Sequence, residues 1–534
     1  MRRALSSGAV LIVAIAGCTS SAAHHATTTS PRWPSSQSSG PLTSSQGPSV
    51  LLVCNGSTVR CPALPRSAGP YYRTVQGAVD AARSGDWILI YPGVYHERGW
   101  PTAGVWITTP DLHIRGLNRN QVIIDGSNGT AAHPCPSAAA QQDLTPRDGI
   151  VVWKASGVTI QNLTVCDFLA GPSGHGNEIW WNGGATTGRI GMGSYAGSYL
   201  TATSEYAPAK LNSPQLAQYG IFADNASGPG LITDSYASNM ADAAYYIGGC
   251  ARVCNVTLAD DTGVSSALGY SGTNAGGGLV IKDSMFRLNR AGIAPNSEND
   301  ADQPSPQDGR CPGSATVSCM IIVGNVIEAN NNPNAPGNAS APPVGIGVEI
   351  AGGEYDTVAD NVIEDQGSWG VLTSDNADSE KPPPIAHCAG GIKNYPLPKF
   401  CLFRARGNLI YGNAFIHDGF FGNPTNSDVA TETLGSYTPR NCFYRNIDLH
   451  GPLTSAPAHI QSASVDGPPC GRAGTGNDPA LASQIICATR VFPCSLPPSR
   501  ARYPKQTSTV MLPLPLLPTM PQPCAGVPKN AFCP

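Results

Sequence analysis

Charged residues are scarce in this sequence, and they do not cluster. Asp, Glu, Lys and Arg make up 13% of the 534 residues, the net charge is −4, and runs of like charge are absent. A protein that holds nucleic acid needs a basic patch that neutralises phosphates. The composition therefore predicts that nucleic acid is not a partner.

Clear helical periodicity is also largely missing. Gly and Pro are abundant instead, at 60 and 48 residues, and they lie between short runs with apolar alternation. That arrangement is typical of many tight turns between strands rather than of disorder. The absence of long helical patterns favours an all-β fold.

A short repeat replaces the missing helices. A small residue followed by an aliphatic or aromatic one opens an extended run about every two dozen residues, at 149–150, 220–221, 244–245, 267–268, 292–293, 345–346 and 370–371. A second run follows and carries Asn or Asp at a fixed place, at Asn162, Asp234, Asp283, Asn325, Asn361 and Asn413. Such a period predicts a solenoid with at least two strands per coil, a single-stranded right-handed parallel β-helix. We expect the Asn and Asp series to hydrogen-bond along the stack at each bend.

The beginning of the repeat region supports the same fold. Residues 72–83 place Val75, Val79 and Ala82 on one helical face, and short strands separated by turn residues follow from Trp87 onward. This segment resembles the entry of pectin-lyase-like β-helix proteins, and with the coils the resemblance covers roughly residues 70–450. It implies a β-helix domain, which we place at residues 51–451, with a helix capping its open end. It does not imply one reaction, because lyases, hydrolases, esterases, epimerases and non-catalytic adhesins share this fold.

The N-terminus predicts export. Arg2 and Arg3 precede an apolar run, residues 9–16, that is too short to span a bilayer as a mature helix. Residues 15–18 match a bacterial lipobox, so we expect a lipoprotein signal peptide at 1–17 and a lipid anchor on Cys18, with the protein facing outside the cytoplasm. An ordinary secretory peptide is the alternative. Residues 18–50, rich in Ser, Thr, Ala and Pro, would form a flexible tether.

The cysteine count is consistent with an oxidising compartment. Setting Cys18 aside leaves 17 − 1 = 16 cysteines, an even number suited to disulfides. The pairs that are easiest to propose are Cys54 with Cys61, Cys250 with Cys254, Cys311 with Cys319, Cys388 with Cys401, and Cys524 with Cys533. The repeat fades in residues 452–534, which we expect to form an irregular, disulfide-tied tail rich in Pro.

Side chains that alternate along each coil should build an outward row. The fourth residue after each small one gives Trp153, Asp224, Gly248, Ser271, Asn296, Glu349 and Ser374, with Phe222 and Tyr246 beside this row. Rings beside carboxylates and amides on such a face suit an extended sugar chain. An ordinary solvent-facing sheet is the other explanation.

Two inserted loops add candidates. Residues 171–184 combine His175 and Glu178 with Trp180 and Trp181, and we expect the paired indoles to be exposed and to bind substrate. Residues 296–302 contain Glu298, Asp300 and Asp302, whose hard oxygen ligands suit Ca²⁺. The spacing lacks the Gly and the distal Glu of an EF-hand loop, so a solvated acidic loop is the alternative.

No complete catalytic signature of the superfamily is present. Residues 174–176 resemble the Gly-His-Gly element of polygalacturonase-like hydrolases, but the only adjacent aspartates, Asp260 and Asp261, follow it, and no Arg-x-Lys comes after it. The Asp-Pro-His motif of mannuronan epimerases is absent as well. These departures disfavour the hydrolase assignment and leave the reaction open.

A lyase or epimerase acting on a uronate needs a base, a group that neutralises the carboxylate, and an acid. The candidates for catalysis are Arg290, Tyr246, His175 and Asp224, and those for substrate binding are Trp180, Trp181, Glu178, Asn296 and Glu349. Arg290 would alternatively pair with Asp242 between coils, and His175 would cap a turn. Two functions follow: cleavage or epimerisation of an extracellular acidic polysaccharide, or non-catalytic binding of an envelope glycan.

Overall fold

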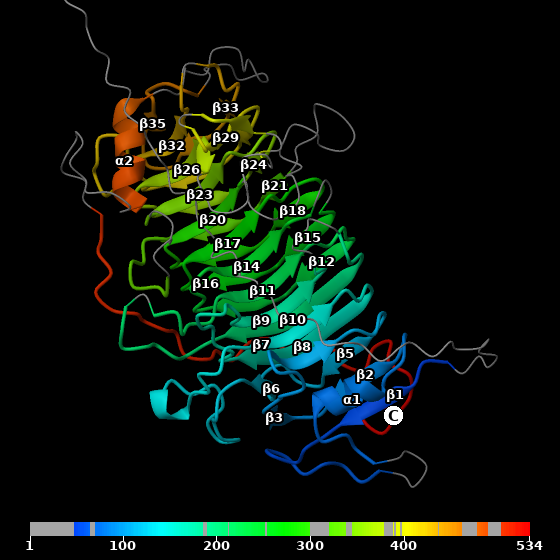
Figure 1. Ribbon diagram of the computed structural model, residues 1–534. Coiled ribbons are helices and arrows are strands. Elements are labelled where there is room, and N and C mark those ends of the chain that lie inside the picture. Colours follow the sequence, from blue (N-terminus) through cyan, green and yellow to red (C-terminus); the bar gives the residue numbers. More distant parts are fainter. Residues whose placement is uncertain are drawn as a thin grey trace, which may run out of the picture.

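The computed structural model describes residues 47–64, 70–184, 190–211, 213–250, 254–298, 320–337, 344–378, 388, 391–395, 398–435, 437–461, 478–489 and 503–534. In this part of the chain, short strands stack into one elongated solenoid (Figure 1). Each complete coil has three strands, one more than the minimum expected from the repeat. None of the helices in these ranges has the length and apolar character required to cross a bilayer.

The first face of the solenoid is a parallel sheet made by the opening strand of each coil. Its strands, in order, are β1 (Val50–Val53), β2 (Trp87–Ile90), β5 (His113–Gly116), β8 (Val158–Cys166), β10 (Tyr195–Thr203), β12 (Gly230–Thr233), β15 (Val256–Ala259), β18 (Leu279–Lys282), β21 (Met320–Val323), β24 (Thr357–Ala359), β30 (Leu409–Tyr411) and β33 (Cys442–Tyr444).

The second face follows after one bend. It contains the second halves of β8 and β10, which run through both faces, together with β3 (Gly93–Tyr95), β6 (Val122–Asp125), β13 (Tyr236–Ser238), β16 (Thr262–Val264), β19 (Met285–Arg287), β22 (Val326–Glu328), β25 (Val362–Glu364), β31 (Ala414–Ile416) and β34 (Ile447–Asp448).

The third face is a separate sheet of eleven parallel strands. They are β4 (Ala103–Ile107), β7 (Asp148–Trp153), β9 (Asn177–Asn182), β11 (Tyr219–Asp224), β14 (Ala243–Gly248), β17 (Leu268–Thr273), β20 (Ala291–Asn296), β23 (Ile346–Ala351), β26 (Trp369–Ser374), β32 (Ser427–Glu432) and β35 (Ser455–Ala456). Within the described ranges, the strand pairings of all three faces are parallel. The parallel β-helix expected from the sequence is confirmed.

The N-terminal end of the solenoid is capped by helix α1 (Val75–Ala81). Thr74 accepts a hydrogen bond from Gly77 N, and the Glu97 carboxylate accepts from Val75 N at 2.6 Å and Gln76 N at 3.1 Å. These acceptors satisfy backbone donors that the first turn of a helix cannot satisfy itself. The expected capping helix is confirmed, and it buries Val75 and Val79 against the first coils.

The core is a continuous apolar column inside the coils. Branched aliphatic residues fill most inward positions, and larger rings such as Tyr245, Tyr270 and Phe286 fill the middle of the column. Because each coil buries its apolar side chains only against adjacent coils, stability is built up coil by coil.

Side-chain amides form ladders at the bends between the first and second faces. The Asn361 amide donates to Ile322 O at 3.0 Å and to Asn413 Oδ1 at 2.9 Å, and its oxygen accepts from Asn325 N. Asn413 repeats this pattern with Asn446. The ladder predicted at Asn325, Asn361 and Asn413 is confirmed.

Two members of the predicted series are wrong by one residue. Asp234 and Asp283 have positive φ angles of 52° and 51°, and the ladder positions fall to the serines that follow them. Ser235 N donates to Asp261 Oδ1, and Ser284 N donates to Asn325 Oδ1. The left-handed bend favours Asp, Asn or Gly at the residue before the ladder, so both positions have similar composition.

Five disulfides lie among the described residues. Cys54–Cys61, Cys250–Cys254, Cys388–Cys401 and Cys524–Cys533 join as proposed. Cys135–Cys166, which spans 31 residues, was not proposed, because only the pairing of β6 with β8 brings its ends together. The proposed Cys311–Cys319 pair lies outside the described ranges.

The C-terminal region is more ordered than expected. Helix α2 (Pro479–Thr489) packs Leu481 and Ile485 onto the outer side of the third face, against Trp369 and Ala430. A small antiparallel sheet, β27 (Asn376–Asp378), β28 (Ile392–Lys393) and β29 (Cys401–Phe403), lies at the same end of the solenoid.

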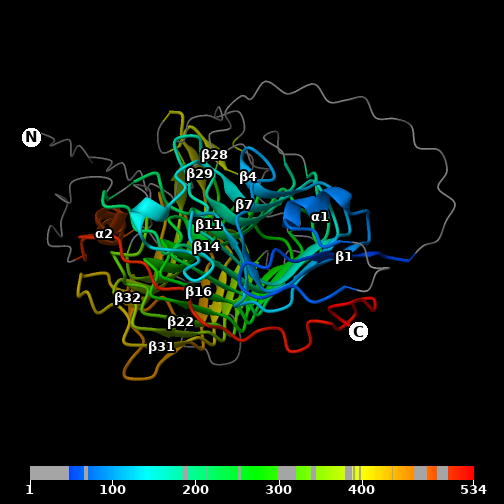
Figure 2. The ribbon, with the colours of Figure 1, turned by 90° about the horizontal axis from the view of Figure 1, so that it is seen from below.

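Residues 503–534, named here the strap, contain no helix or strand but follow the solenoid back toward its N-terminal end. The red segment in Figures 1 and 2 leaves the α2 end and finishes beside β1. Its hydrogen bonds reach Asn334, then Asn239, and finally Arg115. The strap therefore connects coils that are far apart in the stack.

Candidate functional site

The outer side of the third face carries the predicted row. The register places Trp153, Asn182, Asp224 and Gly248 opposite one another on successive strands. Asn296, Ala351 and Ser374 occupy the same row farther along the stack.

Ser271 and Glu349 belong instead to the adjacent outward row, which contains Phe222 and Tyr246. Their assignment to the first row was wrong by two residues. The small residues in register at these strands are Gly269 and Gly347, where an added Cβ would lie 2.7 Å and 2.5 Å from a backbone oxygen of the next strand. Two small residues at a spacing of two made the start of each coil ambiguous in the sequence.

Three tryptophans stack at the N-terminal end of this face. The ring centroids of Trp100 and Trp106 are 5.5 Å apart, and those of Trp106 and Trp153 are 5.4 Å apart. Trp100 is 44% exposed, and the Lys154 ammonium lies 4.9 Å from the centre of the Trp153 ring. We name these three residues the tryptophan stack. Sequence reasoning included Trp153 but missed Trp100 and Trp106, although Trp106 alternates with inward Val105 and Ile107.

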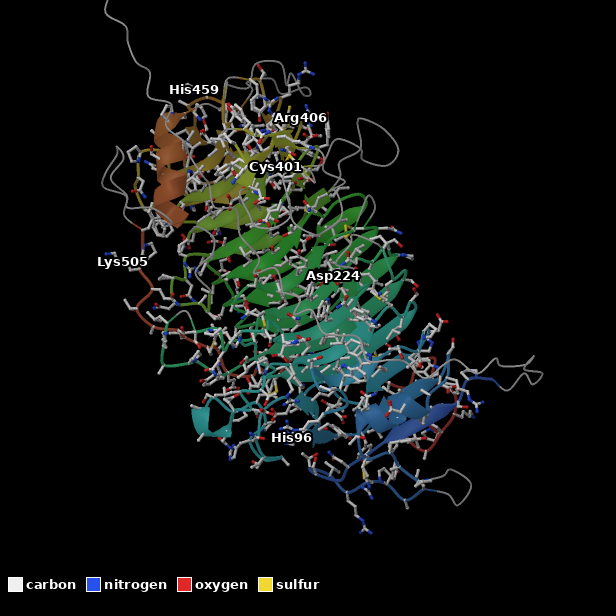
Figure 3. The ribbon with its side chains drawn as sticks, viewed as in Figure 1. His96, Asp224, Cys401, Arg406, His459 and Lys505 are labelled. Atoms are coloured by element: carbon white, nitrogen blue, oxygen red, sulfur yellow. A yellow bond between two sulfur atoms is a disulfide. The ribbon has the colours of Figure 1, made fainter. Side chains whose placement is uncertain are left out.

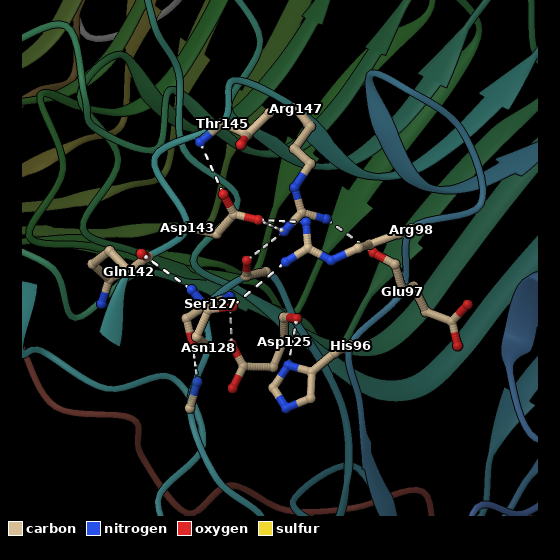
Figure 4. Close-up of polar contacts among 12 residues, drawn as sticks. His96, Glu97, Arg98, Asp125, Ser127, Asn128, Gln142, Asp143, Thr145 and Arg147 are labelled. Atoms are coloured by element: carbon tan, nitrogen blue, oxygen red, sulfur yellow. Dashed lines mark hydrogen bonds and ion pairs between the residues drawn. The ribbon is translucent and has the colours of Figure 1, made fainter. Parts of the chain in front are cut away.

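A polar network fixes the loop that carries Trp100. Arg98 pairs with Asp143 at 2.6 Å, and Asp143 also accepts from Arg147 (Figure 4). The buried Arg147 guanidinium donates further to Glu97 O at 2.9 Å. These contacts, with the backbone bridge between Trp100 and Ala103, hold the exposed indole beside β4.

A second aromatic group lies on β9, β11 and β14. The rings of Trp180 and Phe222 are parallel with centroids 4.9 Å apart, and Phe222 meets the edge of Tyr246 at 4.8 Å. Trp180 Nε1 donates to Asp224 Oδ1 at 3.0 Å. Figure 3 labels Asp224 about midway along the solenoid. The structure therefore brings together three predicted site residues, Trp180, Asp224 and Tyr246.

Gly248 makes room for the Tyr246 ring. A Cβ at Gly248 would lie 2.5 Å from Tyr246 Cε1 and 2.6 Å from its hydroxyl oxygen. The Tyr246 hydroxyl accepts a hydrogen bond from Thr273 N at 3.3 Å, so the ring lies across the Gly248 backbone. The absence of a side chain at Gly248 is what permits this close approach.

Two carboxyls beside these rings are poorly hydrated. Burial raises the pKa of Asp224 to about 7, although the hydrogen bonds from Trp180 and Asn225 oppose the rise. Burial likewise raises the pKa of Asp242 to about 7, where the Tyr219 hydroxyl donates to Oδ2 at 3.0 Å. Asp224 is partly exposed and Asp242 is buried, so Asp224 is the more accessible of the two.

Asn296 and Glu298 form a separate pair farther up the face, and Glu349 lies on the adjacent strand β23. Asn296 Nδ2 donates to Glu298 Oε1 at 2.6 Å, and all three side chains are buried. Burial raises the pKa of Glu349 to about 7. Three strand spacings of about 4.8 Å separate β20 from β11, so Asn296 lies roughly 14 Å from Asp224 and Glu349 lies one strand farther away. The single groove predicted along this face stays a prediction.

The predicted calcium site remains a prediction. Asp300 and Asp302 lie outside the described ranges, and Glu298 is engaged with Asn296. Among the residues that the structure describes, no group of three or more His, Cys, Asp or Glu side chains is arranged to hold a metal ion.

Two residues expected on an exposed loop are inside the solenoid. Trp181 is fully buried, and its Nε1 donates to Val158 O. Glu178 is also fully buried and accepts from Phe168 N at 3.2 Å. Residues 177–182 form β9, so alternation sends Trp180 outward and Trp181 inward. The expectation that both indoles are exposed is wrong.

His175 and Arg290 lie at corners of the coils rather than beside Asp224. His175 Nδ1 contacts Asp148 Oδ2 at 2.9 Å, and this hydrogen bond raises the pKa of the imidazole. Arg290 is 8% exposed and immediately precedes β20, which is three strands away from β11. The Tyr219 hydroxyl donates to Asp242 Oδ2, and the alternative pairing of Arg290 with Asp242 stays a prediction. The four candidates for catalysis therefore do not converge.

Comparison with known proteins finds similarity of fold. No protein-family model and no curated protein matches the chain. Among 59 matching chains of solved structures is the A-module of mannuronan C-5 epimerase AlgE4 from Azotobacter vinelandii, at 12% identity and a TM-score of 0.36, covering 70% of this chain and 90% of that one.

Two further matches come from other proteins. The catalytic unit of a GH87 alpha-1,3-glucanase from Streptomyces thermodiastaticus matches at 12% identity and a TM-score of 0.40, covering 73% of this chain and 66% of that one. The tailspike protein of E. coli bacteriophage HK620, in complex with a pentasaccharide, matches at 10% identity and a TM-score of 0.37, covering 76% and 64%.

Proposed function

We propose that the outer side of the third face binds an extended polysaccharide. The observation that carries this proposal is the tryptophan stack, in which Trp100 is exposed and Trp106 and Trp153 are partly exposed. A pyranose ring packs its apolar face on exposed indole surface while its hydroxyls remain available for polar partners. The partly exposed Trp180, backed by the buried Phe222 ring, extends the aromatic surface along the direction in which the strands stack.

Charged groups beside the rings favour an acidic chain. Lys154 is exposed next to Trp153 and supplies a cation for a sugar carboxylate. Asp224 supplies a hydrogen-bond acceptor for sugar hydroxyls, two strands away from β7. Rings, a cation and an acceptor on successive parallel strands suit a ligand with repeating units better than a compact one.

A second candidate function is cleavage or epimerisation of the same acidic chain. The observation that favours it is the Asp224 pKa of about 7, because such a carboxyl both accepts and donates a proton at neutral pH. Tyr246, across Gly248, is the nearest phenol among the predicted site residues. Without turnover, the protein is a binding or scaffold protein of the envelope.

Binding is tested with pectin, alginate and glycosaminoglycan panels. We expect Trp100→Ala and Trp153→Ala each to weaken binding by on the order of 1 kcal/mol, about fivefold, because each removes ring surface. The matched control is Phe420→Ala, which removes an exposed ring at the other end of the solenoid. Equal affinities of the Trp variants and the control would refute the site.

Turnover is followed on the same panel by ultraviolet absorbance of unsaturated products, and epimerisation by the uronate composition of the chain. We expect Asp224→Asn to abolish either activity and to retain most binding, because proton transfer acts in the transition state. Wild-type binding with neither product supports the non-catalytic alternative.

We also propose that the protein is exported and held at the bacterial membrane by lipid on Cys18. Support comes from the lipobox and from five disulfides in the described part of the chain, since structural disulfides persist in oxidising compartments. The tether would then present the solenoid away from the bilayer.

A further inference from the structure

The strap contacts the solenoid in a way that resembles a bound peptide. We infer that the solenoid body carries a binding site for an extended, proline-rich peptide, and that residues 503–534 are the ligand that occupies it. The contact begins at Tyr503, which packs on Phe421 and the apolar cluster outside the third face. It then passes the corner near Asn334, crosses the second face, and ends on the first face near Tyr71. The paired hydrogen bonds of the site lie away from the third face, and the inference does not depend on glycan binding.

Two asparagines bind the strap backbone through paired hydrogen bonds. Asn239 Nδ2 donates to Leu512 O at 2.8 Å, and Leu512 N donates to Asn239 Oδ1 at 2.9 Å. Asn120 repeats this arrangement with Leu517, at 2.8 Å and 3.0 Å. A side-chain amide that satisfies both groups of one peptide residue acts as a neighbouring strand would, so it recognises extended backbone.

Other body residues continue the contact on both sides. Glu205 Oε1 accepts from Leu514 N at 2.6 Å, between the two asparagines. Arg115 Nη1 donates to Pro523 O at 3.0 Å and to Ala525 O at 2.7 Å. Acceptors and donors of the body thus match donors and acceptors of the strap along most of its length.

Apolar anchors supply the rest of the interface. Leu514 packs on Val94 and Ile123 on the outer side of the second face. At the end of the strap, Phe532 meets the rings of Tyr71 and Tyr91 at 5.6 Å and 5.0 Å. The many prolines between residues 513 and 523 restrict the free segment, which lowers the entropy lost on binding.

The strap has no disulfide to the body. Its only cysteines, Cys524 and Cys533, are joined to each other. Hydrogen bonds and apolar contacts therefore hold the strap, apart from the chain that leads into it. If that chain were cut, the strap would be a separable ligand, and a second copy of the same peptide would compete for the site.

The test uses the full-length protein, with a specific protease site inserted between Pro498 and Ser499 and cut only after folding. We expect the released fragment to co-elute with the body in gel filtration. A hundredfold excess of a fluorescent peptide with the sequence of residues 503–534, its disulfide formed, should replace the fragment at equilibrium. A scrambled peptide of the same composition and the same cysteine positions should not.

Asn120→Ala provides the residue-level test, because the Asn120 side chain makes two hydrogen bonds with the backbone of Leu517. We expect about tenfold weaker binding of the fluorescent peptide to this variant, since two hydrogen bonds are lost. Asn128→Ala, which alters an exposed asparagine whose side chain contacts Gln142 O and Arg98 rather than the strap, should bind like wild type. No incorporation of the peptide, equal incorporation of the scrambled peptide, or equal affinities of the two variants would overturn the inference.

Discussion

Trp180 Nε1 donates a 3.0 Å hydrogen bond to Asp224 Oδ1 on the adjacent strand. The same indole is parallel to the Phe222 ring in its own row. The Trp180 side chain therefore contacts both Phe222 and Asp224, which lies in the adjacent outward row. A change in the charge of Asp224 therefore directly changes the electrostatic environment of the Trp180 indole. This relationship makes the protonation of Asp224 measurable.

We predict that wild-type tryptophan fluorescence titrates near pH 7 and that Asp224→Asn removes this transition. The pKa of Asp224 is raised to about 7 from its ordinary value near 4, because burial disfavours the carboxylate. The raised pKa of Asp224 contributes fully to the free energy of unfolding below about pH 4, and this contribution is lost as the pH rises toward 7. The control Asp283→Asn, at an exposed position, should keep the transition, and a variant Asp224→Asn that still titrates would contradict the prediction.

We predict that Glu178→Gln reduces the loss of stability at alkaline pH. Burial, followed by the nearby Asp167 charge, raises the pKa of Glu178 well above its ordinary value. The folded state therefore holds a proton that the unfolded state releases, so stability falls as the pH rises from about 4.5 toward the folded pKa. Thermal unfolding between pH 5 and pH 9 measures this slope.

The Gln variant should match wild type near pH 5 and exceed it near pH 9. Glu364→Gln, at a partly exposed position, serves as the control and should follow the wild-type slope. If the stability of Glu178→Gln and of wild type fell equally between pH 5 and pH 9, Glu178 would not be responsible for the loss of stability in this pH range. Asp167, whose pKa burial raises to about 8, should account for part of the slope that remains.

We predict that Asn361→Ala destabilises the protein by about 3 kcal/mol. The change leaves Asn325 N and Ile322 O without their ladder partner in a buried bend, and each such group costs about 1–3 kcal/mol. Urea unfolding compares this variant with Asn128→Ala, which loses two long, partly exposed hydrogen bonds and should cost no more than about 1 kcal/mol. A loss no larger than that of the control would mean that the ladder does not stabilise the coils.

We predict that Cys18→Ser prevents lipid attachment, because the lipid is added to that thiol. Detergent-phase partitioning and mass spectrometry of the purified protein measure the outcome. The variant should be shed or remain uncleaved, whereas the Thr19→Ser control should still be lipidated. A lipid-modified Cys18→Ser protein would exclude the lipobox interpretation.

The spacing of small residues and of Asn and Asp was enough to predict the parallel β-helix, and the helical spacing of Val75 and Val79 predicted its capping helix. Inward residues must be apolar in every coil, and each bend needs a residue that tolerates a left-handed backbone, so both requirements recur in the sequence. The same periodicity correctly placed Asp224, Tyr246 and Asn296 on one outer face. It placed Ser271 and Glu349 on the correct face but in the wrong row, because two small residues near the start of each of these strands fit the repeat.

The sequence alone determined the fold, the outward face and most of the local disulfides, because these depend on short-range periodicity and spacing. Only the tertiary structure decided that Trp181 and Glu178 are buried, that Trp100 stacks beside Trp106, and that Cys135 meets Cys166. It also decided the path of the strap, where Leu517 meets Asn120 across 397 residues. Such contacts leave no periodic pattern, because they depend on how distant coils and segments are placed in space.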